Sequence, residues 1–398
     1  MSLNKKTFNT SSAGYIAGLF LYQGGGTSND RTIVTNMEPD LIWMFPNEAN
    51  SAGGRRDVYI IDKAYPGSDE TFVLASAKGM FRQDKSIITW NSDGFTLKGR
   101  SNYQNYEKPE SKYFHADDYW CGIAFQTAAS GATNNDGNTT ATVYANAEGN
   151  YSKIFFTSGG SSTTIGHGLS AAPTFMTCMR IDSSLNPTSY PTLKYEGKQG
   201  STMYDFVNSE YRGDAGYSSH MFDRPLDSSS SHMTANSSTI SVHSSDNLGG
   251  TNGGDYVIYA FAPKSGFMAH AGYTGNSSSS GRTVLTADFD PLVTFIGSEH
   301  DMTMAHAYRR NSGTPVTGSI VWSDADHNAD KEQGINSLTD SEAGTPTGGS
   351  LGSQSIRANH SSNTFQLNCT ETPFNYSGRV YSIFSLGGDL IYYDTSQT

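Results

Sequence analysis

The sequence predicts an all-β protein of three tandem antiparallel β-sandwich domains, jelly-roll-like in form, that arise from an internal repeat. A proline followed by an apolar or aromatic run occurs at Pro39, Pro173 and Pro291. Such runs are typical of strands that begin just after a residue unable to donate to a β-ladder. Other short apolar runs are separated by Gly, Asn and Ser turns. Because no helical periodicity persists over about a dozen residues, these strands indicate a sandwich or jelly roll.

The neighbours of each proline recur in the same order. A Gly-rich break and a short β-branched run come before it, at residues 32–34, 163–165 and 283–285. A closing aromatic strand follows about 80 to 90 residues later, at residues 118–125, 255–261 and 378–384. A period this long corresponds to a whole domain. The repeat therefore predicts domains over residues 1–130, 150–265 and 266–398, with residues 131–149 as a polar linker.

Within this frame the expected strands follow in chain order. The first domain opens at residues 13–22, continues through the Pro39 strand and residues 57–61 and 71–74, and forms a hairpin over residues 86–97. An Asp93-Gly94 pair between two apolar runs is a strong hairpin signal. The second domain opens at residues 153–156, and the third opens at residues 266–273 without an intervening linker.

Composition excludes several classes of protein. The chain has 398 residues, of which 12% are aromatic, so a disordered chain is not expected. A net charge of −12 argues against a nucleic-acid partner. No apolar run approaches the roughly 20 residues of a membrane span, and residues 1–6 lack an apolar signal core. The sequence thus predicts a soluble protein without membrane insertion or an export signal of its own.

Three cysteines, one in each expected domain, lie in or beside apolar strands at Cys121, Cys178 and Cys369. Their odd number and wide spacing fit neither a disulfide framework nor a zinc site. We expect them to be buried, reduced thiols.

The most site-like stretch is the acidic loop from Asp324 to Glu332, whose alternating oxygen-bearing side chains are similar to a calcium loop. The loop lacks the central glycine, and Ile335 stands where a bidentate glutamate belongs. We therefore expect a solvated acidic loop and no metal site or other cofactor.

Glycan hydrolysis would need paired carboxylates or an activated serine. The nearest carboxylates are Asp117, Asp118, Asp205 and Glu210, and the Gly-x-Ser-x-Gly motif is absent. Such pairs are expected by chance in an acidic, loop-rich chain. The sequence predicts no catalytic residues, and hence no enzyme.

Two tyrosine clusters lie in expected loops, one from Tyr103 to Tyr106 and one from Tyr211 to Tyr217. Tyrosine among Ser, Gly and Asn makes adaptable contact surface. These side chains could stack on sugars or pack against a neighbouring subunit. The tripeptide that starts at Arg212 is a weak adhesion motif, and no histidine pair has metal-ligand spacing.

Together the motifs resemble modules of tail-fibre-like and other virion surface proteins of marine bacteriophages and cyanophages. The resemblance is carried by residues 38–43, the hairpin at residues 92–97 and Tyr119-Trp120, with weaker counterparts at residues 168–173 and at the Pro291 and Tyr381 strands. The resemblance implies a virion structural protein displayed on the particle exterior, as a capsid decoration or a tail or fibre component that contributes to host attachment.

The expected location is accordingly the virion, assembled in the host cytoplasm. Expected partners are other capsid or tail proteins, identical copies in a homo-oligomer, with a trimer favoured by the closed symmetry of repeated virion proteins, and a host surface glycan. The alternative interpretation is a glycan-binding or glycan-cleaving adhesin similar to a tail spike.

Overall fold

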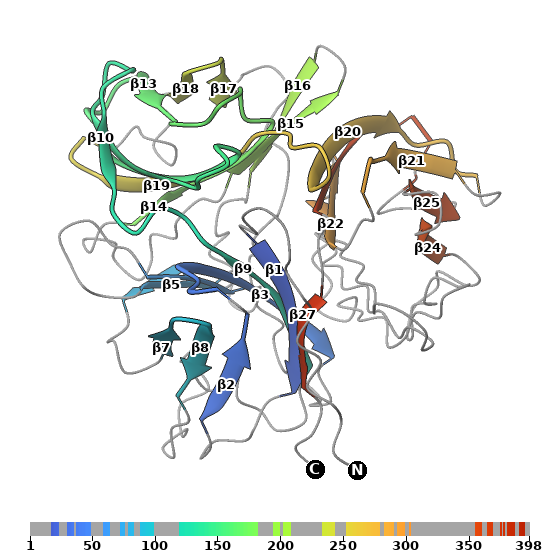
Figure 1. Cartoon of the computed structure of the whole chain (residues 1–398). Coiled ribbons are helices and arrows are strands. Elements are labelled where there is room, and N and C mark those ends of the chain that lie inside the picture. Colours follow the sequence, from blue (N-terminus) through green and yellow to red (C-terminus); the bar gives the residue numbers. More distant parts are fainter. Residues whose placement is uncertain are drawn as a thin grey trace, which may run out of the picture.

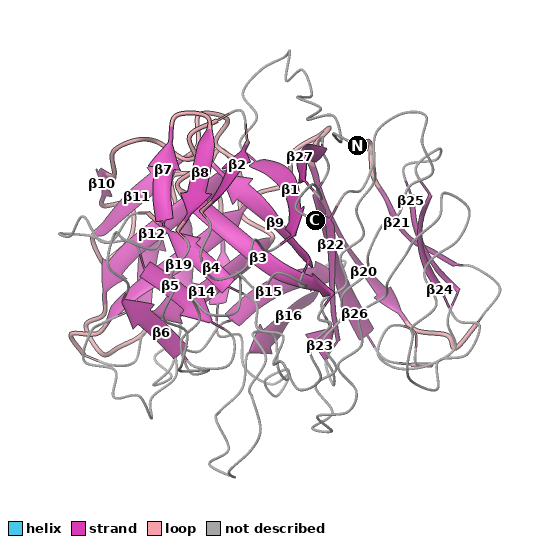
Figure 2. Ribbon diagram, turned by 90° about the horizontal axis from the view of Figure 1, so that it is seen from below, coloured by secondary structure: helices cyan, strands magenta, loops and turns pink. Residues whose placement is uncertain are grey.

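The computed structural model is all-β, with strands β1 to β27 and no helix in the part of the chain that it describes (Figures 1 and 2). All but one of the strand pairings in its sheets are antiparallel, the exception being β1 with β27. The structure describes residues 17–23, 30–35, 37–48, 59–63, 72–75, 79–82, 88–98, 119–181, 194–199, 202–207, 233–242, 252–278, 282–289, 293–298, 302–303, 355–359, 364–368, 375, 377–378, 380–386 and 390–394.

The first segment of the chain builds a three-stranded sheet and, together with one strand from the C-terminal end, a seven-stranded sheet. In spatial order the larger sheet contains β27 (Leu390–Asp394), β1 (Ala17–Gln23), β9 (Tyr119–Phe125), β3 (Leu41–Glu48), β4 (Tyr59–Asp62), β5 (Phe72–Ala75) and β6 (Gly79–Arg82). The smaller sheet contains β2 (Arg31–Val34), β8 (Gly94–Leu97) and β7 (Ile88–Asn91).

The second segment also builds a seven-stranded and a three-stranded sheet. The larger contains β10 (Ala132–Asn134), β11 (Ala141–Ala145), β12 (Tyr151–Thr157), β19 (Asp255–Phe261), β14 (Phe175–Arg180), β15 (Lys194–Gln199) and β16 (Thr202–Val207). The smaller contains β13 (Thr163–Gly166), β18 (Thr239–Val242) and β17 (Met233–Ala235).

The third segment builds a four-stranded and a three-stranded sheet. The larger contains β20 (Met268–Thr274), β26 (Val380–Leu386), β22 (Val293–Ser298) and β23 (Met302–Thr303). The smaller contains β21 (Arg282–Thr286), β25 (Thr364–Asn368) and β24 (Ser355–Asn359). These two sheets lie beside the second segment in Figure 1.

The three segments share one strand order and one register. In each, the closing strand (β9, β19 or β26) lies between the opening strand and the strand that follows the proline. The last residue of the closing strand is Phe125, Phe261 or Leu386. In every segment it is paired with the first residue of the opening strand and with the second residue after the proline. A one-residue slip would exchange the two faces of a strand, so this register keeps equivalent positions on equivalent faces.

The smaller sheets repeat the same pattern. The β-branched run before each proline, in β2, β13 or β21, pairs with the second strand of a two-stranded antiparallel unit. In the first segment this unit is the hairpin expected over residues 86–97, now seen as β7 and β8. Its turn residues are Ser92 and Asp93. Gly94 already belongs to β8, where a Cβ atom would lie 2.0 Å from the carbonyl oxygen of Ile33, so close strand approach requires glycine there.

The expected linker over residues 131–149 is corrected by the structure. This segment contains β10 and β11, which extend the second seven-stranded sheet by antiparallel pairing with β12. Ala141 and Val143 are buried and alternate with less buried neighbours. Strand β11 therefore has the alternating burial of a strand with one face against a core, although polar turn residues flank it in the sequence.

The expected boundary of the last domain is also corrected at its C-terminal end. Strand β27 does not join the third segment but pairs in parallel with β1 of the first, with Leu390 beside Leu19 and Asp394 beside Tyr22. Figures 1 and 2 show the two strands side by side. The end of the fold thus closes onto its beginning.

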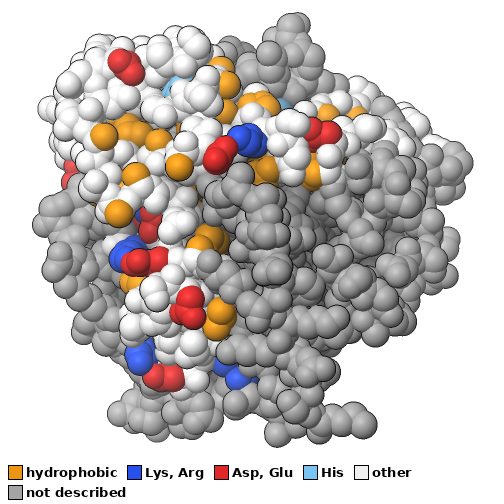
Figure 3. All heavy atoms as spheres, in the orientation of Figure 1, with side chains coloured by type: hydrophobic (Ala, Val, Ile, Leu, Met, Phe, Trp, Pro, Cys, Tyr) orange, Lys and Arg blue, Asp and Glu red, His pale blue; other side chains and the backbone are white. Residues whose placement is uncertain are grey.

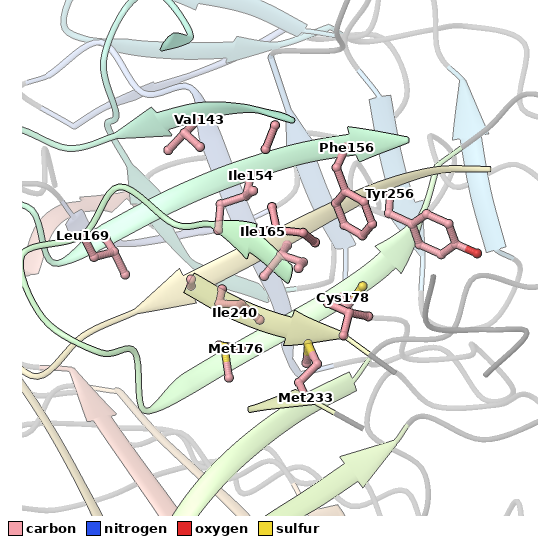
Figure 4. Packing of buried hydrophobic residues seen from close by; sticks show 14 of the residues in the cluster. Val143, Ile154, Phe156, Ile165, Leu169, Met176, Cys178, Met233, Ile240 and Tyr256 are labelled. Carbon is pink, nitrogen blue, oxygen red and sulfur yellow. The ribbon is translucent and has the colours of Figure 1, made fainter. Parts of the chain in front are cut away.

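Hydrophobic cores fill the space between the larger and smaller sheet of a segment. In the first segment Phe20 of β1 meets Phe95 of β8 edge to face, with ring centroids 5.2 Å apart. In the second, buried side chains of β12, β14 and β19 pack against those of β13, β17 and β18 (Figure 4). The labelled members are Val143, Ile154, Phe156, Ile165, Leu169, Met176, Cys178, Met233, Ile240 and Tyr256.

Strands β12 and β19 are buried on both faces. Ile154 and Phe156 point into the core of their own segment, and alternation places Tyr151, Lys153 and Phe155 on the opposite face. That second face is covered by the first segment, as the contacts below show. The described part of the chain contains no helix with the length and apolar character required to cross a bilayer.

Candidate functional site

Aromatic side chains join the sheets of the first and second segments. The ring of Trp43, in β3, lies 5.5 Å from Phe125 of its own sheet. Its neighbours in the second segment are Tyr259 at 6.3 Å and Phe261 at 5.6 Å between ring centroids, both from β19, and both contacts are edge to face. Because Trp43 is 2% exposed and these partners are equally buried, water is excluded from this junction.

The third segment reaches the same aromatic cluster through Phe384 of β26. Its ring stacks on Phe175 of β14, with centroids 4.1 Å apart and planes at 8°. Phe384 also lies 5.6 Å from Phe261. All three segments are therefore packed around Phe175 and Phe261.

A buried ion pair lies within the same junction. Lys153, in the middle of β12, places its Nζ atom 2.9 Å from Oδ1 of Asp62, the last residue of β4. Both side chains are fully buried. A second carboxylate oxygen, Oδ2 of Asp40, lies 3.4 Å from Nζ, and the Asp40 side chain is 16% exposed. One buried ammonium group thus faces two carboxylates, which belong to the other segment.

Further hydrogen bonds orient both carboxylates. The hydroxyl of Tyr259 donates to Oδ2 of Asp62 over 2.8 Å. The backbone N–H of Thr127 donates to Oδ2 of Asp40 over 3.2 Å, and the Thr127 hydroxyl donates to the same oxygen. Tyr259 is the cross-strand partner of Lys153, so sheet pairing alone places the donor beside the ion pair.

The Nζ atom of Lys153 also lies over the Tyr144 ring, 5.3 Å from its centroid. This distance is within the range of a cation–π contact. Tyr144 is the partner of Lys153 across the β11–β12 pair. Lys153 is therefore held between two tyrosine-bearing strands, and the segment expected to be a linker supplies one of them.

The surroundings determine the protonation of this cluster. Burial by itself lowers the pKa of Lys153, but Asp62 and Asp40 outweigh it and raise the pKa above the ordinary value, so Lys153 is protonated at physiological pH. Burial, followed by the nearby carboxylate of Asp62, raises the pKa of Tyr259 well above its ordinary value. Tyr259 is thus a neutral hydrogen-bond donor at physiological pH.

The cluster has other polar atoms that the described residues do not satisfy. The Tyr151 hydroxyl and Oδ1 of Asp40 are buried and have no hydrogen-bond partner among the described residues. Burial, then Asp40 and Asp62, raises the pKa of Tyr151. Two carboxylates against one ammonium group leave a formal excess of negative charge, and a cluster of this kind is costly to bury. The cluster therefore places one amine against two carboxylates, with Lys153 and Asp62 fully buried.

A second buried polar group is His167, just after β13. Its Nδ1 atom accepts a hydrogen bond from the backbone N–H of Leu169 over 3.0 Å, and its Nε2–H donates to the carbonyl of Asn236 over 3.1 Å. Burial lowers the pKa of His167 below the ordinary value. The neutral ring thus ties this loop to the turn between β17 and β18.

The ion pairs at the surface are much more exposed than the Lys153–Asp62 pair. Lys264 and Glu148 form a pair at 2.7 Å, as do Lys98 and Asp30, and the side chains in both pairs are at least about one third exposed. Figure 3 shows acidic and basic side chains next to one another on one face of the molecule. Such pairs contribute little to stability.

Most of the candidate residues chosen from the sequence lie outside the part of the chain that the structure describes. The tyrosine clusters at Tyr103 to Tyr106 and Tyr211 to Tyr217 and the acidic loop from Asp324 to Glu332 lie outside the described residues, as do Asp117, Asp118 and Glu210. Asp205 lies in β16, paired with Glu196 of β15. Within the described ranges no three His, Cys, Asp or Glu side chains could hold a metal ion. Cys178 is buried and is not part of a disulfide bond.

Sequence reasoning did not identify the junction cluster. The signal available was a single lysine inside the apolar strand Tyr151–Thr157, a position where an unpaired charge is rarely buried. Asp62, which follows two isoleucines at the end of β4, gave a similar signal. Neither residue could be paired with the other by spacing, because 91 positions separate them.

Comparisons with known proteins place the chain in a family. No curated protein and no solved structure matches it. One family model, described as "Domain of unknown function (DUF7483)", matches residues 12–385, which is nearly the whole chain. The chain therefore belongs to the DUF7483 family of domains of unknown function.

Proposed function

We propose that this chain is a structural protein of a bacteriophage particle, displayed on the particle exterior, and that its three segments are tandem copies of one jelly-roll-like β-sandwich unit. The shared register supports the tandem copies, because Phe125, Phe261 and Leu386 occupy equivalent positions. The resemblance of the proline strands and hairpin to phage virion modules supports the location.

The observation that carries the structural role is the common junction. Trp43, Phe175, Phe261 and Phe384 bring side chains from all three segments into one aromatic cluster. Strand β27 adds a second connection, since it returns to the first sheet. The aromatic cluster and the pairing of β27 with β1 together hold the three segments in a fixed orientation. A component of a particle surface requires such a fixed orientation. Loops of such units can vary without disturbing the sheets, which suits contact with a changing host surface.

The proposed partners are other capsid or tail proteins and identical copies of the chain, arranged as a trimer. A host surface glycan is the proposed external contact. No catalytic step is part of this role. Sedimentation of the purified chain tests the trimer directly, and a sedimenting mass of a single chain at high concentration contradicts it.

The function is tested by deleting the gene from the phage that encodes it. We expect the purified wild-type particles to contain the chain, and we expect deletion to leave particles that lack it and adsorb more slowly to the host. Normal particles that never contained the chain would contradict a virion role. Shortening of host polysaccharide by the purified protein would instead favour the alternative, a glycan-cleaving adhesin.

A further inference from the structure

We propose that Lys153 and Asp62 condense into an intramolecular isopeptide bond, which joins β12 of the second segment covalently to β4 of the first. The inference rests on the junction geometry and does not depend on a role in a virion. The product would be a cross-link between two seven-stranded sheets, formed by the folded chain from its own side chains.

The two reacting groups are already in contact. Nζ of Lys153 lies 2.9 Å from Oδ1 of Asp62, so the carboxyl carbon is one C–O bond beyond the contacted atom. Both side chains are fully buried and fixed by the strands on either side. A nucleophile held this close to a carboxyl group reacts intramolecularly, so the entropy of bringing the two groups together has already been lost on folding.

Condensation requires a neutral amine and a protonated carboxyl group. An ion pair and its neutral form contain the same number of protons, so the change needs only one proton to move from Nζ to a carboxylate. Asp62 and Asp40 raise the pKa of Lys153 because they stabilise its ammonium form, so this transfer is uphill and the neutral pair is the minor form from which condensation proceeds. Burial penalises two separate charges, which narrows the energy gap to the neutral pair.

The neighbouring groups match the steps of the reaction. Oδ2 of Asp40, 3.4 Å from Nζ, can accept a proton from the ammonium group and deliver it to the leaving oxygen. Tyr259 donates to Oδ2 of Asp62 over 2.8 Å, the oxygen on which negative charge develops in the tetrahedral intermediate. The two N–H and O–H donors of Thr127 hold Asp40 in place.

The step balances without another reactant. The bond from Nζ to the Asp62 carboxyl carbon forms, and the bond from that carbon to Oδ1 breaks. Two of the three ammonium protons leave with Oδ1 as one water molecule, and the third remains on the amide nitrogen. Asp40 relays one of these protons and is unchanged by the reaction. The Tyr144 ring lies over the Lys153 ammonium group, and both reacting side chains are fully buried, so exclusion of water protects the amide from hydrolysis.

The test is the mass of the denatured full-length chain, combined with a tryptic map. We expect the wild-type chain to be lighter than its sequence mass by one water molecule. Trypsin should fail to cut after Lys153, and the peptide of residues 57–63 should remain joined to residues 113–180. The exposed pair Lys264–Glu148, which has a similar separation, is the internal control and should remain unlinked.

Asp40→Asn is the matched variant, since it keeps the size of the side chain and removes the proton acceptor. We expect this variant to be folded by circular dichroism and to have its full sequence mass. A folded wild-type chain with its full sequence mass overturns the proposal, whatever the variants do. So does a water loss that the map assigns to a succinimide at Asp93-Gly94 or Asp136-Gly137 instead of to the linked peptides.

Discussion

Phe175 and Phe384 stack face to face across the boundary between the second and third segments, with ring centroids 4.1 Å apart. They occupy different sheets, β14 and β26, and they are 209 positions apart in the chain. Phe175 is paired in its own sheet with Phe261, which also contacts Trp43 of the first segment. One stacked pair therefore connects the third segment to the aromatic cluster that joins the other two.

Removing this stack should weaken the whole fold. We expect Phe384→Ala to lower the free energy of unfolding by about 3–5 kcal/mol, the usual cost of truncating a buried phenylalanine. A double-mutant cycle with Phe175→Ala should give a coupling energy of about 0.5–1.5 kcal/mol. Urea unfolding followed by tryptophan fluorescence measures both. The partly exposed Phe267 is the control, and its truncation should cost much less. Additive effects of the two variants would show that the stack does not couple the segments.

Gly122 tests the packing of β9 against its neighbours. A Cβ atom at this position would lie 2.2 Å from the ring of Phe20 and 2.6 Å from the carbonyl oxygen of Trp43. We expect Gly122→Ala to destabilise the chain by about 1–3 kcal/mol, since the ring must move within a filled core. Gly159 serves as the control, because a Cβ atom added there would have no other atom within 4 Å. Equal melting temperatures for the two alanine variants would contradict the close approach.

His167 should make stability depend on pH. Because burial lowers its pKa, the unfolded chain binds a proton at higher pH than the folded chain. Stability is therefore retained above the ordinary histidine pKa of about 6.5 and decreases as the pH falls below it. The hydrogen bond to the Asn236 carbonyl and the charge of Asp136 act in the opposite direction on this pKa but do not outweigh burial. Urea midpoints of the wild type and of His167→Gln between neutral and mildly acidic pH measure the effect. If the urea midpoints of the two proteins changed in parallel with pH across this range, His167 would not be the cause of the pH dependence.

The acidic loop that begins at Asp324 should not need an ion. We expect exchange of Asp324 and Asp326 for Asn to leave the melting temperature unchanged, because the loop lacks the central glycine and the bidentate glutamate of a calcium site. Differential scanning calorimetry with and without calcium is the measurement. A large fall in melting temperature with EDTA, restored by calcium in the wild type alone, would establish a site there.

Local patterns predicted the all-β class and most of the central strands. The runs after Pro39 and Pro173 form β3 and β14, and the first two closing strands lie within a residue of their expected bounds because they are continuous and aromatic. The third closing strand begins two residues later than expected, at Val380. In the second segment, however, the sequence did not reveal the counterpart of the Asp93-Gly94 hairpin. Its turn begins at Asn236, whose side chain accepts hydrogen bonds from the backbone N–H groups of Ser238 and Thr239. An Asx turn of this kind does not need glycine.

Features that depend on distant pairing could not be read from the sequence. Strand β27 is short and pairs with β1, at the other end of the chain, so no neighbouring pattern indicates its sheet. The Lys153–Asp62 ion pair likewise joins two strands whose proximity follows only from packing of the first segment on the second. Both features are contacts between different segments. The repeated sequence pattern predicts only the contacts inside a single segment.

Immunogold labelling of intact phage particles tests the proposed function most directly. Antibodies raised against the purified chain should label the exterior of undisturbed wild-type particles at regular positions, and gene-deleted particles should remain unlabelled. Labelling that appears only after the particles are disrupted, or that does not depend on the gene, would contradict display of this chain on the particle surface.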